Sequence, residues 1–318
     1  MKSKQIGRSA KGGAGLKAPA SSPRLFAAAL AFILIGPCAD GFGAGIKAAK
    51  PGQAPDTSIE PGANRFEELD PRNFDRSENI DHVWWPLKPG MQWIFEGTNE
   101  EDGKRVPHRI VFTVTDLMKV IGGVRTRVIF DSDFSDGKLV EKELAFFAQD
   151  KAGTVWHLGE YAERYDGDII GGQIWHVGNP EGAKAGIMMP ADPRSGTLSY
   201  SEGYAPPPFN WTDRGRVYQT GQKVKVPAGN YDDVLVIEEF DASDPGAFQL
   251  KYYARGVGNI RVGLRGKTGG LHEILDLTKV HQLSPKDLAE VRATALDLEK
   301  RASMYPAQPP LERISIIE

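Results

Sequence analysis

His157 is the residue whose type and neighbours best suit catalysis. It stands in the segment VWHLGEY, three residues before Glu160. A histidine beside a carboxylate can act as a general acid or base near neutral pH. In an extended strand, Val155 and His157 face one side and Trp156 faces the other. The alternative is a half-exposed strand histidine with a structural role, because no nucleophile motif accompanies it.

Two neighbouring segments carry carboxylates at alternate positions, namely Asp131 and Asp133, then Glu141 and Glu143. If the segments pair as a hairpin, all four side chains lie on one face of the sheet. They then form either a carboxylate site or a solvated face. The solvated face is favoured by their neighbours Val140, Lys142 and Leu144. Of the four, Glu143 joins His157 and Glu160 in the candidate catalytic set.

The sequence holds no familiar metal or cofactor motif. In DSDFSDG, residues 131–137, the acidic residues and the glycine are out of step with a calcium-binding loop, and Asp136-Gly137 predicts a hairpin turn instead. The histidines show neither HxH nor HExxH spacing, and the chain lacks GxSxG, a phosphate-binding loop and a dinucleotide fingerprint. We therefore predict no metal site and no cofactor, and we favour a binding protein over an enzyme.

Aromatic side chains are concentrated in IDHVWWPLKPGMQWIFEG, residues 80–97. Trp93 and Phe95 share one strand face and are expected in the core, whereas Trp84 and Trp85 point opposite ways, which leaves one of them at a rim. A rim aromatic beside an apolar cavity would bind ligand; core packing is the alternative. Other aromatics in glycine- and proline-rich stretches could line the same opening. The candidate ligand-binding residues are Trp84, Trp85, Trp156, Trp175, Tyr204 and Trp211.

Alternating strands must position these residues. Apolar and charged residues alternate in HRIVFTVTD, VRTRVIFDSDF, KLVEKELAFFAQD and TVWHLGEY, which short glycine-containing turns separate. Residues 165–218 hold much of the glycine and proline, which predicts long loops with a few short strands. Regular strands resume over residues 217–280. The expected fold is mainly β, an antiparallel meander curled into a half-barrel or barrel, with one C-terminal α-helix.

The rest of the chain follows from composition and helix signals. Residues 1–44 are predicted to be a signal peptide and residues 45–78 a disordered linker, followed by a β-rich domain over residues 79–283. Residues 284–305 form the helix and residues 306–318 a tail. Ser284 caps the helix, Pro285 opens its first turn, and a narrow apolar stripe predicts packing on the sheet.

The leader predicts a periplasmic or secreted protein. Its apolar run LFAAALAFILIG has 12 residues, whereas a membrane span needs about 20. Two alternatives anchor the protein to a membrane: an uncleaved leader, or a lipid on the single cysteine, Cys38. Pro37 disfavours lipidation, because bacterial lipoproteins carry a small residue at that position. Without a cysteine pair, the domain must be held together by its core.

The charge balance limits the partners. The chain has 39 basic and 42 acidic residues, and without residues 1–44 it has 33 and 41, a net charge of −8. No basic cluster offsets this charge, which argues against nucleic acid and against anionic lipid surfaces. An apolar small molecule or lipid, or an envelope protein, remains as partner. The oligomeric state stays open.

Four spaced motifs resemble a family of secreted, uncharacterised bacterial β-rich proteins. They are PLKPG followed by W and EG, a Val-Arg-Thr strand, FAQDKAGTVW and YARGVG, within about residues 73–305. The resemblance implies an exported β-rich domain and brings no activity. Arg255 stands where the family pattern has proline, and Gly256 and Gly258 should preserve the turn. More distantly, the hairpins resemble the open-barrel periplasmic lipoprotein carriers.

Three functions remain open. A periplasmic binding or carrier domain predicts a cavity lined by aromatics and few titratable groups, gated by residues 165–218. An envelope interaction module predicts no cavity and an exposed apolar patch. A small-molecule hydrolase or isomerase predicts that His157 points into a cavity near Glu160, Glu143 or Asp131. The absence of catalytic motifs favours the carrier, with an apolar or lipid-like ligand.

Overall fold

The computed structural model describes residues 65–101, 103–179, 182–206, 211–241, 246–266, 273–302 and 312–313. The predicted signal peptide, Cys38 and most of the predicted linker and tail lie outside these residues. In the described part of the chain, no helix is both long enough and apolar enough to cross a membrane.

Antiparallel strands dominate the fold. A short 3-10 helix, η1 (Pro71–Asn73), precedes them and one α-helix, α1 (Pro285–Ala302), follows. The first strands are β1 (Met91–Glu101), β2 (Lys104–Ile121), β3 (Val124–Ser135), β4 (Lys138–Gln149), β5 (Val155–Asp166) and β6 (Asp168–His176). The others are β7 (Lys184–Met189), β8 (Tyr200–Ser201), β9 (Gly203–Tyr204), β10 (Arg214–Val226), β11 (Gly229–Phe240), β12 (Ala247–Ala254), β13 (Gly258–Gly266), β14 (Ile274–Gln282) and β15 (Glu312–Arg313).

The predicted hairpin turns are confirmed. Asp136 and Gly137, with φ of 47° and 73°, form the turn between β3 and β4. A two-residue hairpin turn that matches the right-handed twist of its strands requires a positive φ at both central residues. The pair therefore fixes the register in which Asp131 lies opposite Glu143.

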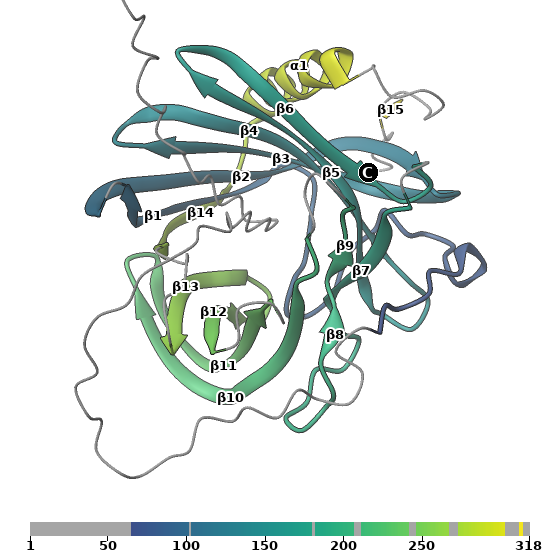
Figure 1. Ribbon diagram of the computed structural model, residues 1–318, viewed down its shortest axis with the longest axis vertical. Coiled ribbons are helices and arrows are strands. Elements are labelled where there is room, and N and C mark those ends of the chain that lie inside the picture. Colours follow the sequence, from purple (N-terminus) through teal and green to yellow (C-terminus); the bar gives the residue numbers. More distant parts are fainter. Residues whose placement is uncertain are drawn as a thin grey trace, which may run out of the picture.

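The sheet curls until its two ends meet. Its order is β8-β10-β11-β12-β13-β14-β1-β2-β3-β4-β5-β7-β9, with β6 paired to β5. The first and last strands of this path, β8 and β9, are separated in the chain by Glu202 alone. Figure 1 shows β1–β6 above and β10–β13 below, facing each other across the interior. The sheet is thus a curled, open one, which confirms the expected fold class.

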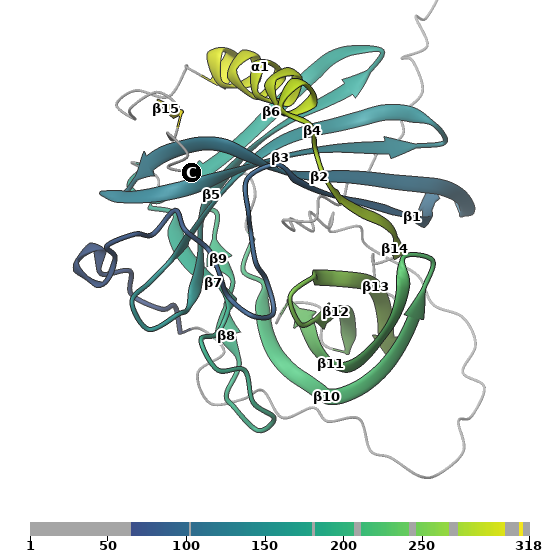
Figure 2. The ribbon, with the colours of Figure 1, turned by 180° about the vertical axis from the view of Figure 1, so that it is seen from behind.

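Helix α1 covers the outer face of the upper half, as Figure 2 shows from behind. Ala295, Leu298 and Ala302 pack with apolar residues of β2–β5 in one cluster. Three ion pairs hold the helix to the sheet: Lys119–Glu299 at 2.6 Å, Arg292–Asp116 at 2.6 Å and Arg301–Glu163 at 2.7 Å. The Asp287 amide donates to Ser284 Oγ at 3.2 Å, so the predicted cap is confirmed.

The main core fills the interior between the two halves. It contains Trp85, Trp93 and Phe95, and apolar residues from strands of both halves. The prediction that Trp93 and Phe95 belong to the core is confirmed. Both inner faces contribute to one core, as in other folds that pack sheet on sheet.

Residues 165–218 contain more regular structure than the predicted long loops. They hold β6, β7, β8, β9 and the start of β10. Their glycines allow close approach of backbones: a Cβ on Gly186 would lie 1.9 Å from the carbonyl carbon of Glu202. Glycine content in this region therefore reflects tight packing at the meeting ends of the sheet.

A candidate ligand site inside the curled sheet

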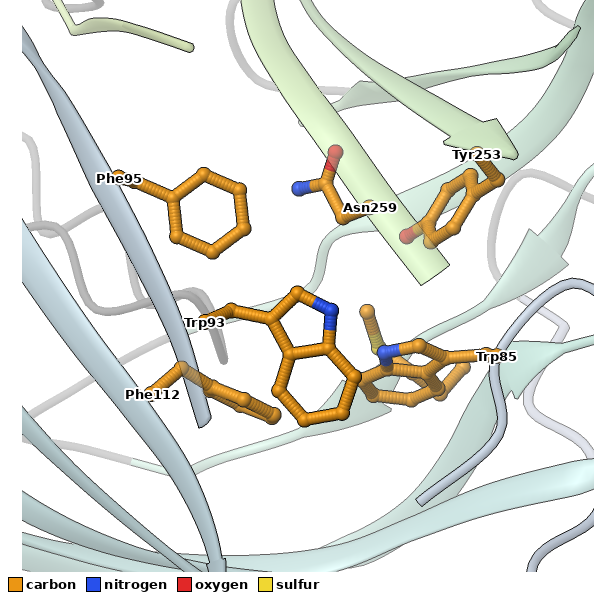
Figure 3. Close-up of a pocket in the computed structure, with 7 residues that line it drawn as sticks. Trp85, Trp93, Phe95, Phe112, Tyr253 and Asn259 are labelled. Atoms are coloured by element: carbon orange, nitrogen blue, oxygen red, sulfur yellow. The ribbon is translucent and has the colours of Figure 1, made fainter. Parts of the chain in front are cut away.

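A small cavity lies among aromatic side chains of the interior. Figure 3 shows Phe95 and Phe112 on one side and Trp85 and Tyr253 on the other, with Trp93 between them. Met188 and Asn259 complete the lining. The lining therefore joins β1, β2, β7, β12 and β13 with the segment before β1. Its volume of about 20 Å³ is room for about one water molecule.

Strand alternation and one hydrogen bond fix these rings. Trp93 and Phe95 share the inner face of β1, and the ring of Trp93 lies edge-on to Phe112 with centroids 5.8 Å apart. The indole N–H of Trp93 donates to the carbonyl of Val257 at 2.9 Å. This bond ties the start of β1 to the turn that precedes β13. The cavity wall is thus built from elements far apart in the chain.

The four alternating carboxylates are buried, so the favoured interpretation of a solvated face is wrong. Their exposed fractions run from 0% to 3% for Asp131, Asp133, Glu141 and Glu143. Their side chains lie on the inner face of β3 and β4, the same face as the core residues Ile129 and Ala145. Helix α1, together with the apolar residues beneath it, covers the outer face of these strands, so both of their faces are enclosed. The four carboxylates, which lie on the inner face, consequently project into the interior.

More ionisable residues surround this group. His108 Nε2 lies 3.2 Å from Glu273 Oε1, and His108 Nδ1 lies 3.5 Å from Asp133 Oδ1. Glu141 is 3.7 Å from Arg164. Gln249 donates to Glu273 at 3.3 Å, which links β12 to the segment before β14. The carboxylates thus reach from β3 and β4 across to the lower half of the sheet.

A second set of buried groups lies in the lower half. Lys251 Nζ is 3.6 Å from Glu239 Oε2, and both side chains are buried. Glu202, between the meeting ends of the sheet, interacts electrostatically with Glu239 and Asp213. Glu273 interacts with both sets, because it acts on Asp131 and on Glu239. The carboxylates of the two sets are therefore close enough to repel one another.

Many interior polar atoms have no hydrogen-bond partner among the described residues. They include Asp133 Oδ1 and Oδ2, Glu143 Oε1, Glu160 Oε2, Glu202 Oε1 and Oε2, Glu239 Oε1 and Oε2, and the Tyr200 hydroxyl. In folded proteins, buried polar groups are nearly always paired with protein or ordered water. Each of these atoms therefore calls for a partner that the described residues do not supply.

Burial changes the protonation of these groups. It raises the pKa of Glu141 to about 7 against the attraction of Arg164, and that of Glu239 to about 7 against Lys251. For Glu143 and Glu160, burial and then neighbouring carboxylates raise the pKa well above its usual range. The interior at neutral pH is therefore partly protonated, or else balanced by cations.

The structure brings the candidate catalytic residues together. His157 Nε2 lies 3.7 Å from Glu160 Oε2, and Glu143 interacts with Glu160. His157 is 2% exposed, so it is buried and not half-exposed as its structural interpretation expected. It stacks on Phe147 at 4.7 Å and meets the edge of Trp175 at 4.8 Å. Burial lowers its pKa to about 3, which keeps the imidazole neutral.

The candidate ligand-binding aromatic residues lie in different parts of the structure. Trp85 lines the cavity, whereas Trp175 and Trp211 pack together at 5.2 Å beside His157. Trp156 belongs to the cluster under the helix, and its indole N–H donates to Asp150 at 2.9 Å. Two more lie elsewhere: Trp84 is covered by the guanidinium of Arg255, and Tyr204 lies against Phe66.

The prediction that Trp84 or Trp85 stays at a rim is wrong. They are 7% and 5% exposed. Two contacts explain this: Arg255 lies 4.0 Å above the Trp84 ring, and Phe147 meets Trp85 at 4.9 Å. Both rings are therefore buried although they point in different directions.

Comparison with known proteins adds little to this geometry. No protein-family model matches the chain, and no curated protein matches it. A Bacteroides fragilis protein described as exported, with a YmcC-like fold, aligns at a TM-score of 0.36 and 13% identity over 63% of this chain and 99% of its own. A Parabacteroides distasonis protein described as a lipoprotein aligns at a TM-score of 0.35 and 12% identity, over 63% of this chain and 98% of its own. Similarity this low carries no argument about function.

Several interior residues were not singled out from the sequence. They are Glu202, Asp213, Glu239, Lys251, Tyr253, Asn259 and Glu273. The sequence of β3 could have indicated that the interior acids are buried, because both faces of this strand carry apolar residues. Val128 and Phe130 lie on one face and Ile129 lies on the other. Apolar residues on both faces indicate a strand covered on both sides, so acids in either phase are buried. For isolated acids such as Glu202, no local pattern existed.

No preformed metal centre is found in the described chain: no group of three or more His, Cys, Asp or Glu has an arrangement that could hold a metal ion. The carboxylates are numerous yet spread along the interior. The site is therefore best described as an aromatic cavity bordered by an extended acidic wall.

Proposed function

We propose that this chain is an exported binding or carrier protein that holds an apolar or lipid-like ligand inside its curled sheet. Export is supported by the leader in residues 1–44, where basic residues precede the apolar run. The ligand would lie between the two halves, with its apolar part against the rings around Trp93. Aromatic walls with a few polar groups are typical of small-molecule sites.

One observation carries this proposal: the interior combines an aromatic cavity with buried polar atoms that no described residue satisfies. A protein core built only for stability would pair or replace such groups, because each unpaired one costs about 1–3 kcal/mol. The cavity of about 20 Å³ would be the starting point of a larger ligand-binding site. A ligand would enlarge it by separating the rings.

The enzyme alternative has one observation in its favour, the approach of His157 to Glu160. His157 is enclosed by Phe147, Trp175 and Trp211 and does not line the cavity. A substrate would have to displace these rings to reach it. The interaction module is supported less, because the large exposed apolar residues of the described chain lie on different elements, and among them only Ile169 and Ile170 are adjacent in sequence.

Native mass spectrometry of protein purified gently from the periplasm tests the proposal. We expect a mass above that of the polypeptide, and release of an apolar compound on solvent extraction. The variant Phe112→Glu, which places a charge in the aromatic wall, should carry less of that compound while keeping its β-sheet circular dichroism. An empty protein that also takes up no added amphiphile would overturn the proposal.

A further inference from the structure

The interior has far more buried acids than bases. Nine carboxylates are buried there with exposures of 3% or less: Asp131, Asp133, Glu141, Glu143, Glu160, Glu202, Asp213, Glu239 and Glu273. We call these nine the acidic interior. Among described bases, Lys251, His108, His157 and Arg214 are buried near them; burial keeps His157 neutral, and Arg214 acts on Glu202.

Buried acids elsewhere in this chain are paired differently. Asp116, Glu163 and Glu238, on the outer face of the sheet, each meet an arginine at 2.5–2.7 Å. Within the acidic interior, the ion pairs to His108, His157, Arg164 and Lys251 are longer, at 3.2–3.7 Å. The chain thus supplies close guanidinium partners where an acid is structural. In the acidic interior, Glu141 meets the guanidinium of Arg164 at 3.7 Å, and no described arginine lies within 3 Å of the nine carboxylates.

Other buried polar groups point into the same space. His157 Nε2 has no hydrogen-bond partner among the described residues and lies 3.7 Å from Glu160. The Tyr200 hydroxyl is likewise buried without a described partner, and it lies near Glu202 and Glu239. These atoms are neither carboxylates nor part of the cavity lining. They indicate that a polar group that the described residues do not supply belongs among them.

The acidic interior adjoins the aromatic cavity through packed side chains. Trp85 lines the cavity and meets Phe147 at 4.9 Å, Phe147 stacks on His157 at 4.7 Å, and His157 leads to Glu160. On the other side Tyr253 lines the cavity and interacts with Glu239 and Glu202. One elongated molecule could therefore contact both regions.

We propose that the ligand is a cationic amphiphile, with an ammonium or other amine head in the acidic interior and an apolar chain among the aromatic rings. This rests on the proposed binding function and names the chemistry of its ligand. An ammonium donates three hydrogen bonds and carries the missing positive charge, and charge-assisted bonds of this kind are the strong ones. A fatty acid or anionic lipid would instead meet like charge.

Titration with three probes of equal chain length tests this proposal. Dodecylamine, 1-dodecanol and dodecanoic acid are added to the exported protein at pH 7.5, and binding is followed by tryptophan fluorescence, because Trp85 and Trp93 line the cavity. We expect dodecylamine to bind about tenfold to hundredfold more tightly than dodecanol, the range that one or two charge-assisted hydrogen bonds give. Dodecanoic acid should bind most weakly.

The double variant E143Q/E160Q should lose most of the preference for the amine and keep its affinity for dodecanol. The matched control is E96Q, on the outer face of β1, whose side chain is 55% exposed; it should behave as wild type. If the double variant does not fold, E239Q in β11 provides the same comparison from the opposite side of the interior.

The outcomes separate the two proposals. Equal binding of dodecylamine and dodecanol, or tighter binding of dodecanoic acid, would overturn the cationic head group and leave the carrier function standing. Failure of all three probes to bind would count against both. An amine preference that E96Q removes as strongly as E143Q/E160Q would assign the preference to surface charge and also overturn the inference.

Discussion

At the residue scale, the central feature is a set of carboxylates where a core would normally be apolar. Glu143 lies opposite Ala162 in the β4–β5 ladder and is 2% exposed. The sequence predicted its strand and its phase correctly. Its burial was missed because two flanking residues, Val140 and Lys142, are compatible with an open face. Whether a strand face is open depends on what covers it, and here helix α1 and β10–β13 cover both.

Replacing Glu143 by glutamine should stabilise the unliganded protein at pH 8. The amide keeps the shape and removes a carboxyl that folding must keep protonated or desolvate as an anion, so we expect about 1–3 kcal/mol more free energy of unfolding. At pH 5 the effect should nearly vanish, because the carboxyl is then neutral in the folded protein. Urea denaturation of E143Q measures this, with E96Q expected to change stability by less than about 0.5 kcal/mol. A destabilised E143Q at pH 8 would mean that the Glu143 carboxylate has a strong partner.

At the element scale, the short strands near residue 200 decide how the sheet ends meet. Ala185 pairs with Gly203 in the β7–β9 ladder, and the Glu202 amide donates to the Asp213 carbonyl at 2.9 Å. These pairings join segments that are distant in sequence and only two residues long. Local periodicity cannot reveal strands of that length, whereas the long hairpins and the capped helix were predicted correctly from their alternation and caps.

The substitution Gly186→Ala should disrupt this junction. A Cβ there would lie 1.9 Å from the Glu202 carbonyl carbon and 2.1 Å from the Gly203 nitrogen. Both are backbone atoms, so we expect a loss of about 3 kcal/mol or more in the free energy of unfolding. Gly171→Ala in β6 is the matched control, since nothing lies within 4 Å of its Cβ, and it should change stability by less than about 1 kcal/mol. Similar unfolding midpoints in urea for the two variants would show that the β7–β9 junction is loosely held.

At the scale of the whole molecule, the acidic interior makes stability depend on pH. Glu141, Glu239 and Asp213 have pKa values raised by burial to about 7, whereas in the unfolded chain the glutamates titrate near 4.5 and the aspartate near 3.8. Their contribution to stability is complete below these unfolded pKa values and is lost as pH rises through 7. His157, with its pKa lowered to about 3, acts oppositely and costs stability as pH falls below 6.5.

We therefore expect the unliganded protein to be more stable at pH 5 than at pH 8. Among the described residues, the carboxyls with raised pKa values outnumber the histidines with lowered ones, which are His82, His157 and His281. A tenfold difference in proton affinity between the folded and unfolded states corresponds to about 1.4 kcal/mol. The difference should be several kcal/mol, measured as the free energy of unfolding in urea at the two pH values. Saturating dodecylamine should reduce the difference by stabilising the protein at pH 8. Stability that increases steadily from pH 5 to pH 8 would mean that the interior carboxylates ionise without cost.

The location of a bound amphiphile tests the central claim most directly. We would crystallise the protein with 12-bromododecylamine and locate the bromine by anomalous diffraction. We expect a peak beside Trp93 and Phe112, with the amine 2.7–3.2 Å from carboxylates of the acidic interior. A peak on the outer surface, or none at a concentration that saturates the fluorescence change, would contradict a ligand site inside the curled sheet.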